Sequence, residues 1–446
     1  MTTFAPIFAP AALRAAVDDR AWIGAMLEAE RALAAAESRA GLVSAGAAAA
    51  IAEACRVELY DVGEIVEQAR LSGTPATPLV RALRDRVGPD GADSVHRGAT
   101  SQDILDTAAM LVCRSALDLI VADLAAVAAA CARLAEEHRD TPMAARTLLQ
   151  QAVPTTFGLK AAGWLVALLD ARARLVSIRR DGLAAQLGGA AGTLGALGAA
   201  GPEVARLFAR ELDLAEPTLP WHTNRVRIAE LGAALASVAG VAGKIGLDVA
   251  LLMQIEVGEV AEPSMPGRGG SSAMPHKRNP VGSALAVAGA RSAAAAAGLL
   301  TESLLQEHER AAGAWHAEWA ALSSALVSAG GAVASIREVT EGLQVSSERM
   351  RRNLELGGGL LMAEQVALRL TEAMGAAGAH QIVRELSLRA AGEGGSLRDE
   401  LIADGRVREH LSEAEIDAAL DPAAALEAAG PLVDRALDHY RKETGR

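Results

Sequence analysis

The longest stretch of this chain without Gly or Pro lies between Gly98 and Pro142, and the helix expected within it runs from about Asp103 to about His138. Ala and Leu dominate it, and these residues favour helix over strand. At about 1.5 Å per residue, a helix of this length is on the order of 50 Å long. Such a helix exceeds the usual length in globular proteins, so the stretch predicts an elongated helical bundle.

The rest of the chain is also helical in character and shows no alternating apolar and polar runs of the kind that form strands. Further long helices are predicted over 157–186, from about 228 to 257, from about 281 onward, and up to about 341. Segments with Gly and Pro separate shorter helices, one of which starts near Ser44. The sequence therefore predicts an all-α fold with three helical domains, residues 1–102, 103–341 and 342–446. Apolar stripes this long need partners, so we expect a homo-oligomer.

The composition limits the classes of partner. The chain carries a net charge of -12 and no basic cluster, which argues against nucleic acid as a partner. A few local cations can still bind a small anionic substrate. The three cysteines, Cys55, Cys113 and Cys131, form neither a disulfide framework nor a zinc pattern. We expect them to be small apolar core residues in a reducing compartment.

The sequence also bears on location. The N-terminal residues lack the basic segment and apolar stretch of a signal peptide. The apolar segment Ile228–Val260 contains Glu230, Lys244, Asp248 and Glu256. We expect such charges to exclude a membrane span and to place this segment inside a bundle. The chain is therefore predicted to be a soluble cytoplasmic protein with no membrane partner.

Three polar segments, residues 96–103, 146–156 and 269–280, each lie next to a predicted long helix. Their hydroxyl, amide and cationic side chains suit recognition of an anionic substrate. They can meet if helices from neighbouring subunits cross. A fourth segment, Gly188–Gly201, is rich in Gly but follows a helix and lacks a Walker lysine. We interpret it as a loop that covers a substrate rather than a phosphate cradle.

The three polar segments carry a specific resemblance. Residues Gly270–Pro280 (GSSAMPHKRNP) resemble the signature loop of the fumarase/aspartase superfamily. Residues His96–Thr107 (HRGATSQDILDT) and Arg146–Thr156 resemble its first and second conserved regions, in the same order. The resemblance implies a homotetramer with a central bundle of long helices, active sites built from three subunits, and no cofactor or metal ion. It also implies addition or elimination next to a carboxylate through an aci-carboxylate carbanion.

Two positions depart from the lyases of this superfamily. In adenylosuccinate lyases and fumarases a histidine follows the threonine of the second region. A glutamate five residues after the signature asparagine pairs with that histidine. Here these positions are Leu148 and Ala284. A leucine cannot transfer a proton, so the group that protonates an amine or hydroxide leaving group is absent.

One reaction of the superfamily does not need this pair. In 3-carboxy-cis,cis-muconate cycloisomerases the nucleophile is a carboxylate of the substrate, which is ionised at neutral pH because its pKa is about 4. Residues 221–225, 306–319 and 342–359 also resemble the bacterial members of this group. The resemblance implies conversion of 3-carboxy-cis,cis-muconate, a tricarboxylate, to 4-carboxymuconolactone in the β-ketoadipate pathway of protocatechuate degradation.

The resemblance also implies roles for single residues. Ser271 is the expected proton carrier, and Lys277 and Asn279 are expected to stabilise the aci-carboxylate. The residues expected to contact the substrate are His96, Arg97, Thr100, Ser101, Thr147, Gln150, Ser272, Met274, His276 and Arg225. For the two hydroxyl side chains of the first region, capping of the following helix is the alternative. For His222, His308 and His316 we favour a structural role.

Several alternatives stay open. Gln151 stands where related cycloisomerases can carry histidine, so the proton would come from Ser271 or water if that histidine is their donor. A lyase such as adenylosuccinate lyase would need another group in place of the missing pair. A substituted muconate could replace the unsubstituted substrate. A non-catalytic helical scaffold is disfavoured because Ser271, Lys277 and Asn279 are all present.

Overall fold

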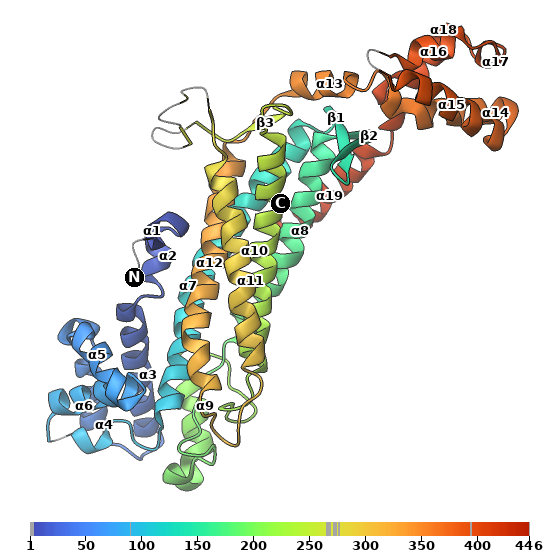
Figure 1. Cartoon of the computed structure of the whole chain (residues 1–446). Coiled ribbons are helices and arrows are strands. Elements are labelled where there is room, and N and C mark those ends of the chain that lie inside the picture. Colours follow the sequence, from blue (N-terminus) through green and yellow to red (C-terminus); the bar gives the residue numbers. More distant parts are fainter. Residues whose placement is uncertain are drawn as a thin grey trace. The chain divides into compact units, whose positions relative to one another are not determined.

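The computed structural model describes residues 4–89, 91–264, 269–270, 274, 277–392 and 395–445. The chain forms two compact units. Unit 1 contains Met1–Ala125, Asp170–Lys244 and Leu285–Ile336. Unit 2 contains Ala126–Leu169, Ile245–Ala284 and Arg337–Arg446. Helices make up most of both units (Figure 1).

The elements of the first half are α1 (Ala5–Phe8), α2 (Ala11–Ala15), α3 (Asp19–Arg39), α4 (Ala45–Ala54), η1 (Val57–Leu59), α5 (Val62–Ser72), α6 (Ala76–Val87), η2 (Ala92–Ser94), α7 (Ser101–Glu137), β1 (Pro142–Thr147), β2 (Gln150–Thr156), α8 (Phe157–Ser177), the π-helical turn η3 (Ile178–Gly182), η4 (Gly195–Ala200) and α9 (Gly201–Glu211).

The elements of the second half are α10 (Val226–Leu252), β3 (Val260–Ala261), α11 (Val281–Glu302), α12 (Ala314–Glu341), β4 (Gln344–Val345), α13 (Ser347–Glu355), η5 (Leu360–Met362), α14 (Ala363–Met374), α15 (Ala376–Ala390), α16 (Leu397–Ala403), α17 (Gly405–Arg408), α18 (Glu413–Leu420), η6 (Pro422–Ala425) and α19 (Ala429–Thr444).

The predicted helices are present, and the all-α class is confirmed. The stretch without Gly or Pro forms α7, which has 37 residues, and α12 ends at Glu341 as the sequence predicts. The helix predicted to start near Ser44 is α4, whose N-cap is Ser44. The Ser44 hydroxyl accepts a hydrogen bond from the Ala47 N–H at 3.1 Å, which satisfies one free donor of the first turn.

The sequence does not predict the antiparallel hairpin of β1 and β2, which occupies residues 142–156 of unit 2. Pro142 pairs with Thr156 and Thr147 pairs with Gln150, with an irregularity between Ala144 and Arg146. The expectation of a plain polar segment before a helix is therefore wrong here. The irregularity interrupts the two-residue period of burial, and this period is the signal by which a strand is usually found.

In unit 1 the stretches of α7, α10, α11 and α12 lie side by side (Figure 1) because small residues let their backbones approach closely. A Cβ on Gly243 of α10 would lie 2.6 Å from the Cβ of Ala290 in α11. A Cβ on Gly289 of α11 would lie 2.9 Å from the carbonyl oxygen of Ser328 in α12. Both distances are shorter than van der Waals contact, so these two positions require glycine.

Unit 2 has a separate aliphatic core among its C-terminal helices α14 to α18. The buried side chains are Val366, Leu370, Leu386, Leu397, Leu401 and Ile416, among others. The loop before η5 joins this core, since the Gly358 carbonyl accepts a hydrogen bond from the Leu397 N–H at 2.9 Å. A core of aliphatic side chains agrees with the low aromatic content of the chain.

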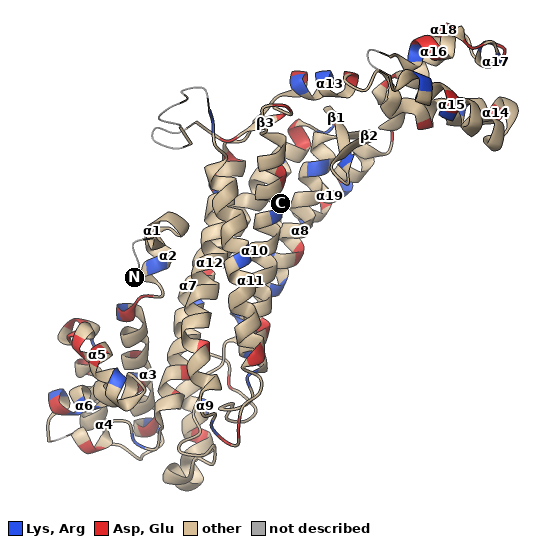
Figure 2. Cartoon of the chain, in the orientation of Figure 1, with Lys and Arg blue, Asp and Glu red and all other residues tan. Residues whose placement is uncertain are grey.

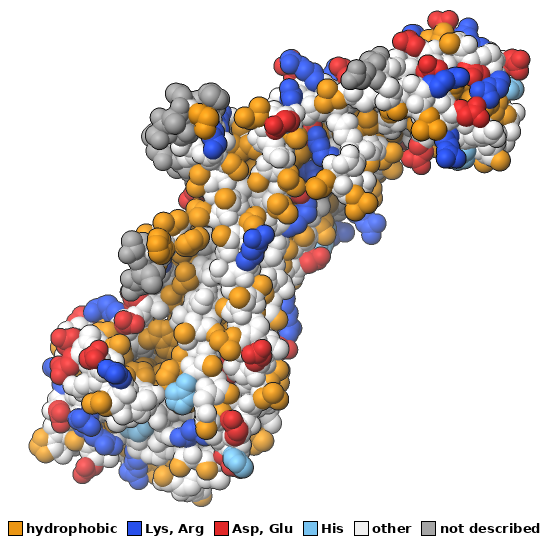
Figure 3. Space-filling view, viewed as in Figure 1, with side chains coloured by type: hydrophobic (Ala, Val, Ile, Leu, Met, Phe, Trp, Pro, Cys, Tyr) orange, Lys and Arg blue, Asp and Glu red, His pale blue; other side chains and the backbone are white. Residues whose placement is uncertain are grey.

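Four helices of the described chain, α7, α10, α11 and α12, are long and apolar enough to cross a membrane by length and composition. Helix α10 covers most of the segment whose charges we expected to exclude a span, and that expectation stays a prediction. Between 33% and 67% of the most apolar window of each helix is buried inside the chain. Charged side chains are sparse along these helices (Figure 2), and hydrophobic side chains reach their surface (Figure 3).

The two units do not follow the predicted domains 1–102, 103–341 and 342–446. Helices α7, α8, α10, α11 and α12 each contribute residues to both units. The three predicted domains therefore stay a prediction.

The close approach of α11 and α12 can be tested by Gly289→Ala. The added Cβ meets the Ser328 carbonyl, so we expect a loss of about 1–3 kcal/mol in unfolding free energy. The matched control is Gly298→Ala in the same helix, where nothing lies within 4 Å of the Cβ position. The control should be neutral or gain up to about 1 kcal/mol. Thermal melting measures both, and equal melting temperatures would contradict the packing.

Candidate active site

The first predicted region is held in unit 1 by the fully buried carboxylate of Asp103. Its oxygens accept hydrogen bonds from the backbone N–H groups of Thr100, Gly188 and Gly189, each at 2.9 Å. The Nε2 atom of His222 lies 2.7 Å from the same carboxylate. A buried carboxylate needs several donors. Here they come from three segments of the chain, which the carboxylate fixes relative to one another.

The glycine-rich segment is packed against this region. A Cβ on Gly188 would lie 2.9 Å from the Cε1 atom of His222, and Gly189 has a φ of +71°, where a side chain is strained. His222 is 4% exposed, which agrees with the structural role predicted for it. That the segment covers a substrate stays a prediction.

The hydroxyl side chains of the first region are free within the described part of the chain. Helix α7 begins at Ser101, so Thr100 occupies the N-cap position. The Asp103 carboxylate accepts the Thr100 backbone N–H, but neither the Thr100 nor the Ser101 hydroxyl makes a hydrogen bond with the described residues. Capping by these hydroxyls is therefore not observed, and both groups are available to a ligand.

His96 and Arg97 precede this helix and have acidic neighbours. The Nδ1 atom of His96 lies 2.6 Å from Oε1 of Glu30, a buried residue of α3. Arg97 donates from Nη1 to the Leu42 carbonyl at 2.7 Å. Burial raises the pKa of Glu37 to about 8, and the charge of Arg97 opposes this rise. The motif identified the two basic residues but not Glu30 and Glu37, which read as ordinary polar positions of an amphipathic helix.

Arg225 lies in a buried ion-pair network. Its guanidinium donates to both oxygens of Asp106, at 2.7 and 3.0 Å, and from Nε to both oxygens of Glu318, at 2.9 and 3.1 Å. Trp315 donates from Nε1 to Asp106 at 3.0 Å. Arg225 is 2% exposed. The expectation that Arg225 binds the substrate is therefore corrected: it joins α7, α12 and the segment before α10.

In unit 2 a second buried carboxylate, Glu259, anchors the second region. Arg146 of β1 donates from Nη1 and Nη2 to the two Glu259 oxygens at 2.9 and 2.7 Å, a bidentate geometry. The side-chain amide of Asn353 in α13 donates to Glu259 at 2.7 Å. The hairpin is thereby fixed while the side chains of Thr147 and Gln150 stay exposed and make no hydrogen bond with the described residues.

Backbone hydrogen bonds connect described residues of the third region. The Gly269 carbonyl accepts a hydrogen bond from the Asn279 N–H at 2.9 Å, and the Met274 carbonyl accepts one from the Lys277 N–H at 3.0 Å. A Cβ on Gly269 would lie 2.9 Å from the Asn279 carbonyl oxygen, and the φ of Gly269 is +73°. The Lys277 side chain is exposed. Three predicted site residues lie outside the described residues: Ser271, Ser272 and His276.

The N-terminus of the helix after this loop is hydrogen-bonded to a buried carboxylate. Glu262 accepts hydrogen bonds from the N–H groups of Gly282 and Ser283, at 3.1 and 2.8 Å, in the first turn of α11. A carboxylate at a helix N-terminus satisfies free donors and matches the helix dipole. Both buried acidic anchors, Glu259 and Glu262, precede the loop in the chain, and Glu262 binds the start of the helix that follows it.

The predicted residues thus fall into two groups. Those of segment 96–101 belong to unit 1, and those of segments 147–150 and 274–279 belong to unit 2.

Comparison with known proteins assigns this chain to a family. A family model described as lyase matches residues 9–295, and one described as the adenylosuccinate lyase C-terminus matches residues 359–436. The chain belongs to this lyase family, the fumarase/aspartase superfamily.

Three members of the superfamily cover almost the whole chain. It is 47% identical over 442 residues to a 3-carboxy-cis,cis-muconate cycloisomerase of Bradyrhizobium diazoefficiens, with 98% of each chain covered. It is 48% identical over 443 residues to a nitrosuccinate lyase of Streptomyces davaonensis, covering 97% of this chain and 93% of the relative. The crystal structure of a 3-carboxy-cis,cis-muconate lactonizing enzyme from Pseudomonas putida has a TM-score of 0.93 at 42% identity, with 99% of each chain covered.

The hairpin of this superfamily member ends in a strained turn. Leu148 and Leu149 connect Thr147 to its strand partner Gln150, and their φ values are +50° and +67°. Two positive φ values in a two-residue turn are typical of type I′, which favours Asn-Gly. The two leucine side chains are 97% and 78% exposed. Backbone strain and exposed apolar surface coincide at the position where the superfamily's lyases carry a histidine.

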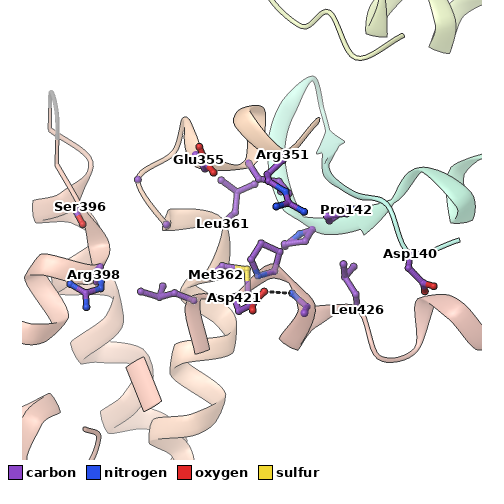
Figure 4. A pocket seen from close by; sticks show the side chains of 17 residues that line it. Asp140, Pro142, Arg351, Glu355, Leu361, Met362, Ser396, Arg398, Asp421 and Leu426 are labelled. Atoms are coloured by element: carbon purple, nitrogen blue, oxygen red, sulfur yellow. Dashed lines mark hydrogen bonds between the residues drawn. The ribbon is translucent and has the colours of Figure 1, made fainter. Parts of the chain in front are cut away.

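A cavity of about 670 Å³ lies elsewhere in unit 2, between the base of the hairpin, the end of α13 and the loops before α16 and η6 (Figure 4). Its polar side chains are largely engaged, since Arg398 donates to both Asp417 oxygens and Asp421 accepts from the Ala423 N–H. The described residues that line it include none of the predicted substrate-binding residues.

The strain of the turn can be tested by the double change Leu148→Asn and Leu149→Gly. Each leucine in a left-handed conformation costs roughly 1–2 kcal/mol, so we expect a higher melting temperature. The matched control is Leu71→Asn, since Leu71 is 92% exposed but lies in α5. Its effect should stay within about 0.5 kcal/mol. A lower melting temperature of the double variant would contradict the strain.

Proposed function

We propose that this protein converts 3-carboxy-cis,cis-muconate to 4-carboxymuconolactone, as a cytoplasmic enzyme of protocatechuate degradation. The relatives with this name that match at 44–47% identity support the proposal. The observation that carries it is the exposed Leu148 at the tip of the hairpin, together with Ala284. The chain has apolar side chains at the two positions where a lyase that releases an amine or hydroxide needs a proton donor.

Lactone formation does not need the proton donor that is missing at positions 148 and 284. A substrate carboxylate attacks a carbon of the diene, and the displaced π electrons move to the carbon next to another carboxylate as an aci-carboxylate. One proton then adds to that carbon. The attacking carboxylate is already ionised, so no base is needed to activate it and no leaving group needs protonation. Positioning of the internal nucleophile supplies much of the rate.

Three residues of the signature loop have matching roles in this proposal. Lys277 and Asn279 stabilise the aci-carboxylate, and Ser271 transfers the proton. Gln151 is not a proton donor, and its side-chain amide donates a hydrogen bond to the Asn353 carbonyl at 3.0 Å.

Several residues bind the substrate carboxylates in the proposal. The hydroxyl and amide groups that make no hydrogen bond within the described chain are suited to this task. The proposed set is His96, Arg97, Thr100, Ser101, Thr147, Gln150, Ser272, Met274 and His276.

A homotetramer with sites shared between subunits is part of the proposal. Large apolar side chains stay exposed on the long helices, including Leu119 of α7, Leu247 of α10 and Leu299 of α11. Exposed apolar side chains on long helices favour association with other copies. Assembly would also let the two groups of site residues come from different subunits.

A second function is favoured by the 48% identity to a nitrosuccinate lyase. Nitrite is the anion of an acid about as strong as a carboxylic acid, so it also leaves without protonation. The absence of the histidine and glutamate at positions 148 and 284 therefore fits nitrite elimination as well. Adenylosuccinate cleavage is less favoured because its amine leaving group needs a proton.

A substrate panel tests the proposal. The purified protein is incubated separately with 3-carboxymuconate, nitrosuccinate and adenylosuccinate. The assays follow loss of diene absorbance for 3-carboxymuconate, release of nitrite for nitrosuccinate and formation of fumarate for adenylosuccinate. We expect turnover of 3-carboxymuconate with kcat/KM of roughly 10⁴ M⁻¹s⁻¹ or more. Turnover of nitrosuccinate alone would establish the second function, and turnover of none would remove both.

The proposed proton carrier is tested by Ser271→Ala. We expect turnover of 3-carboxymuconate to fall by roughly 10²–10⁴-fold, the usual contribution of a positioned acid. Melting temperature and oligomer size, measured by light scattering, should stay as in the unchanged protein. A rate equal to that of the unchanged protein would place the proton donor elsewhere.

A further inference from the structure

His96 is proposed above to bind the substrate, but its partner Glu30 has no assigned function in that chemistry. His96 has a φ of +61°, a left-handed conformation that is uncommon outside glycine. Its Nδ1 atom lies 2.6 Å from Oε1 of Glu30. Glu30 is 1% exposed, and its Oε2 atom has no partner among the described residues. A buried glutamate in the core of α3 is costly unless it is paired, and among the described residues its side chain is paired with His96.

This contact fixes the state of the imidazole ring. A carboxylate bound to Nδ1 orients the ring and stabilises the imidazolium form. The other ring nitrogen of His96, Nε2, has no hydrogen-bond partner among the described residues. The His96 side chain is 16% exposed. A ring held in this way directs a single N–H donor toward a ligand.

The charges around His96 favour the imidazolium. Burial lowers the pKa of His96, but the charge of Glu30 and its hydrogen bond raise it. Asp103 on α7 also raises it, and Arg84 on α6 lowers it. The resulting pKa of His96 is above its ordinary value. Glu37, seven residues after Glu30 on α3, is a second buried carboxyl, but burial raises its pKa to about 8 and it is not among the groups that shift the pKa of His96.

We propose that Glu30 is a positioning residue that keeps His96 protonated, so that its Nε2–H binds a carboxylate of the substrate. His96 stands four residues before Thr100, whose free hydroxyl is assigned to the same substrate. Glu30 does not touch the substrate and acts through the ring. This inference rests on the proposed function, because it needs an anionic substrate at the first region.

The direction of the pH dependence follows from the raised pKa. His96 is protonated below its folded-state pKa and loses the proton as pH rises through that value. Substrate binding should therefore weaken on the alkaline side. Glu30→Gln keeps the shape but removes the charge, so His96 should lose its proton at a lower pH. A shift of one pH unit corresponds to about tenfold in binding at a fixed alkaline pH.

The first experiment measures kcat/KM for 3-carboxymuconate from pH 6 to 9.5. For Glu30→Gln we expect the alkaline limb to move down by about one pH unit. At pH 8 the KM should rise by roughly tenfold with a smaller change in kcat. His96→Asn should remove this limb. The matched control is Glu28→Gln, since Glu28 lies on the same helix but binds Arg31 at 2.8 and 2.6 Å. A Glu30→Gln profile that superimposes on the unchanged one would overturn the proposal.

A second experiment needs no turnover and separates this inference from the proposed substrate. A raised histidine pKa adds stability that is present at low pH and is lost as pH rises through the folded-state pKa. Melting temperatures of Glu30→Gln and the unchanged protein should therefore differ more at pH 6 than at pH 9. A difference that does not depend on pH would show that Glu30 does not hold the charge of His96.

Discussion

The carboxylate of Asp103 is the interaction on which the first region depends. It is fully buried and accepts three backbone N–H groups at 2.9 Å, while His222 lies 2.7 Å away. Loss of this acceptor would leave several buried donors unpaired, at about 1–3 kcal/mol each. The start of α7, the Gly188–Gly189 turn and the segment before α10 are therefore one cooperative structure.

The same arrangement recurs in unit 2, where Glu259 and Glu262 hold the hairpin and the start of α11. In both units buried carboxylates accept hydrogen bonds from nearby backbone N–H groups and arginine side chains. The hydroxyl of Thr100 and the side chain of Thr147 stay unbonded within the described residues. Anchors made of buried carboxylates and contacts made of small neutral groups suit a substrate that is itself an anion.

The helices followed from the sequence because composition and the positions of Gly and Pro are local properties. The hairpin did not, because its strands are short and irregular and its pairing is set by tertiary contacts. Arg225 was misjudged for the same reason. An arginine in a polar motif resembles a substrate ligand, and only the fold brings Asp106 and Glu318 to it. Glu30 gave no signal, since its partner is 66 residues away.

In the proposed reaction a carboxylate of the substrate adds to the diene of the same molecule, and no group leaves it. Such a reaction turns three carboxylates into two and one ester, so each turnover takes one proton from solution. The direct measurement is proton uptake in weak buffer with 3-carboxymuconate, with the product examined by NMR in D₂O. The account predicts uptake of one proton per molecule, a lactone, and one deuterium on the carbon next to a carboxylate. Proton release, or a product that has lost a fragment, would contradict it.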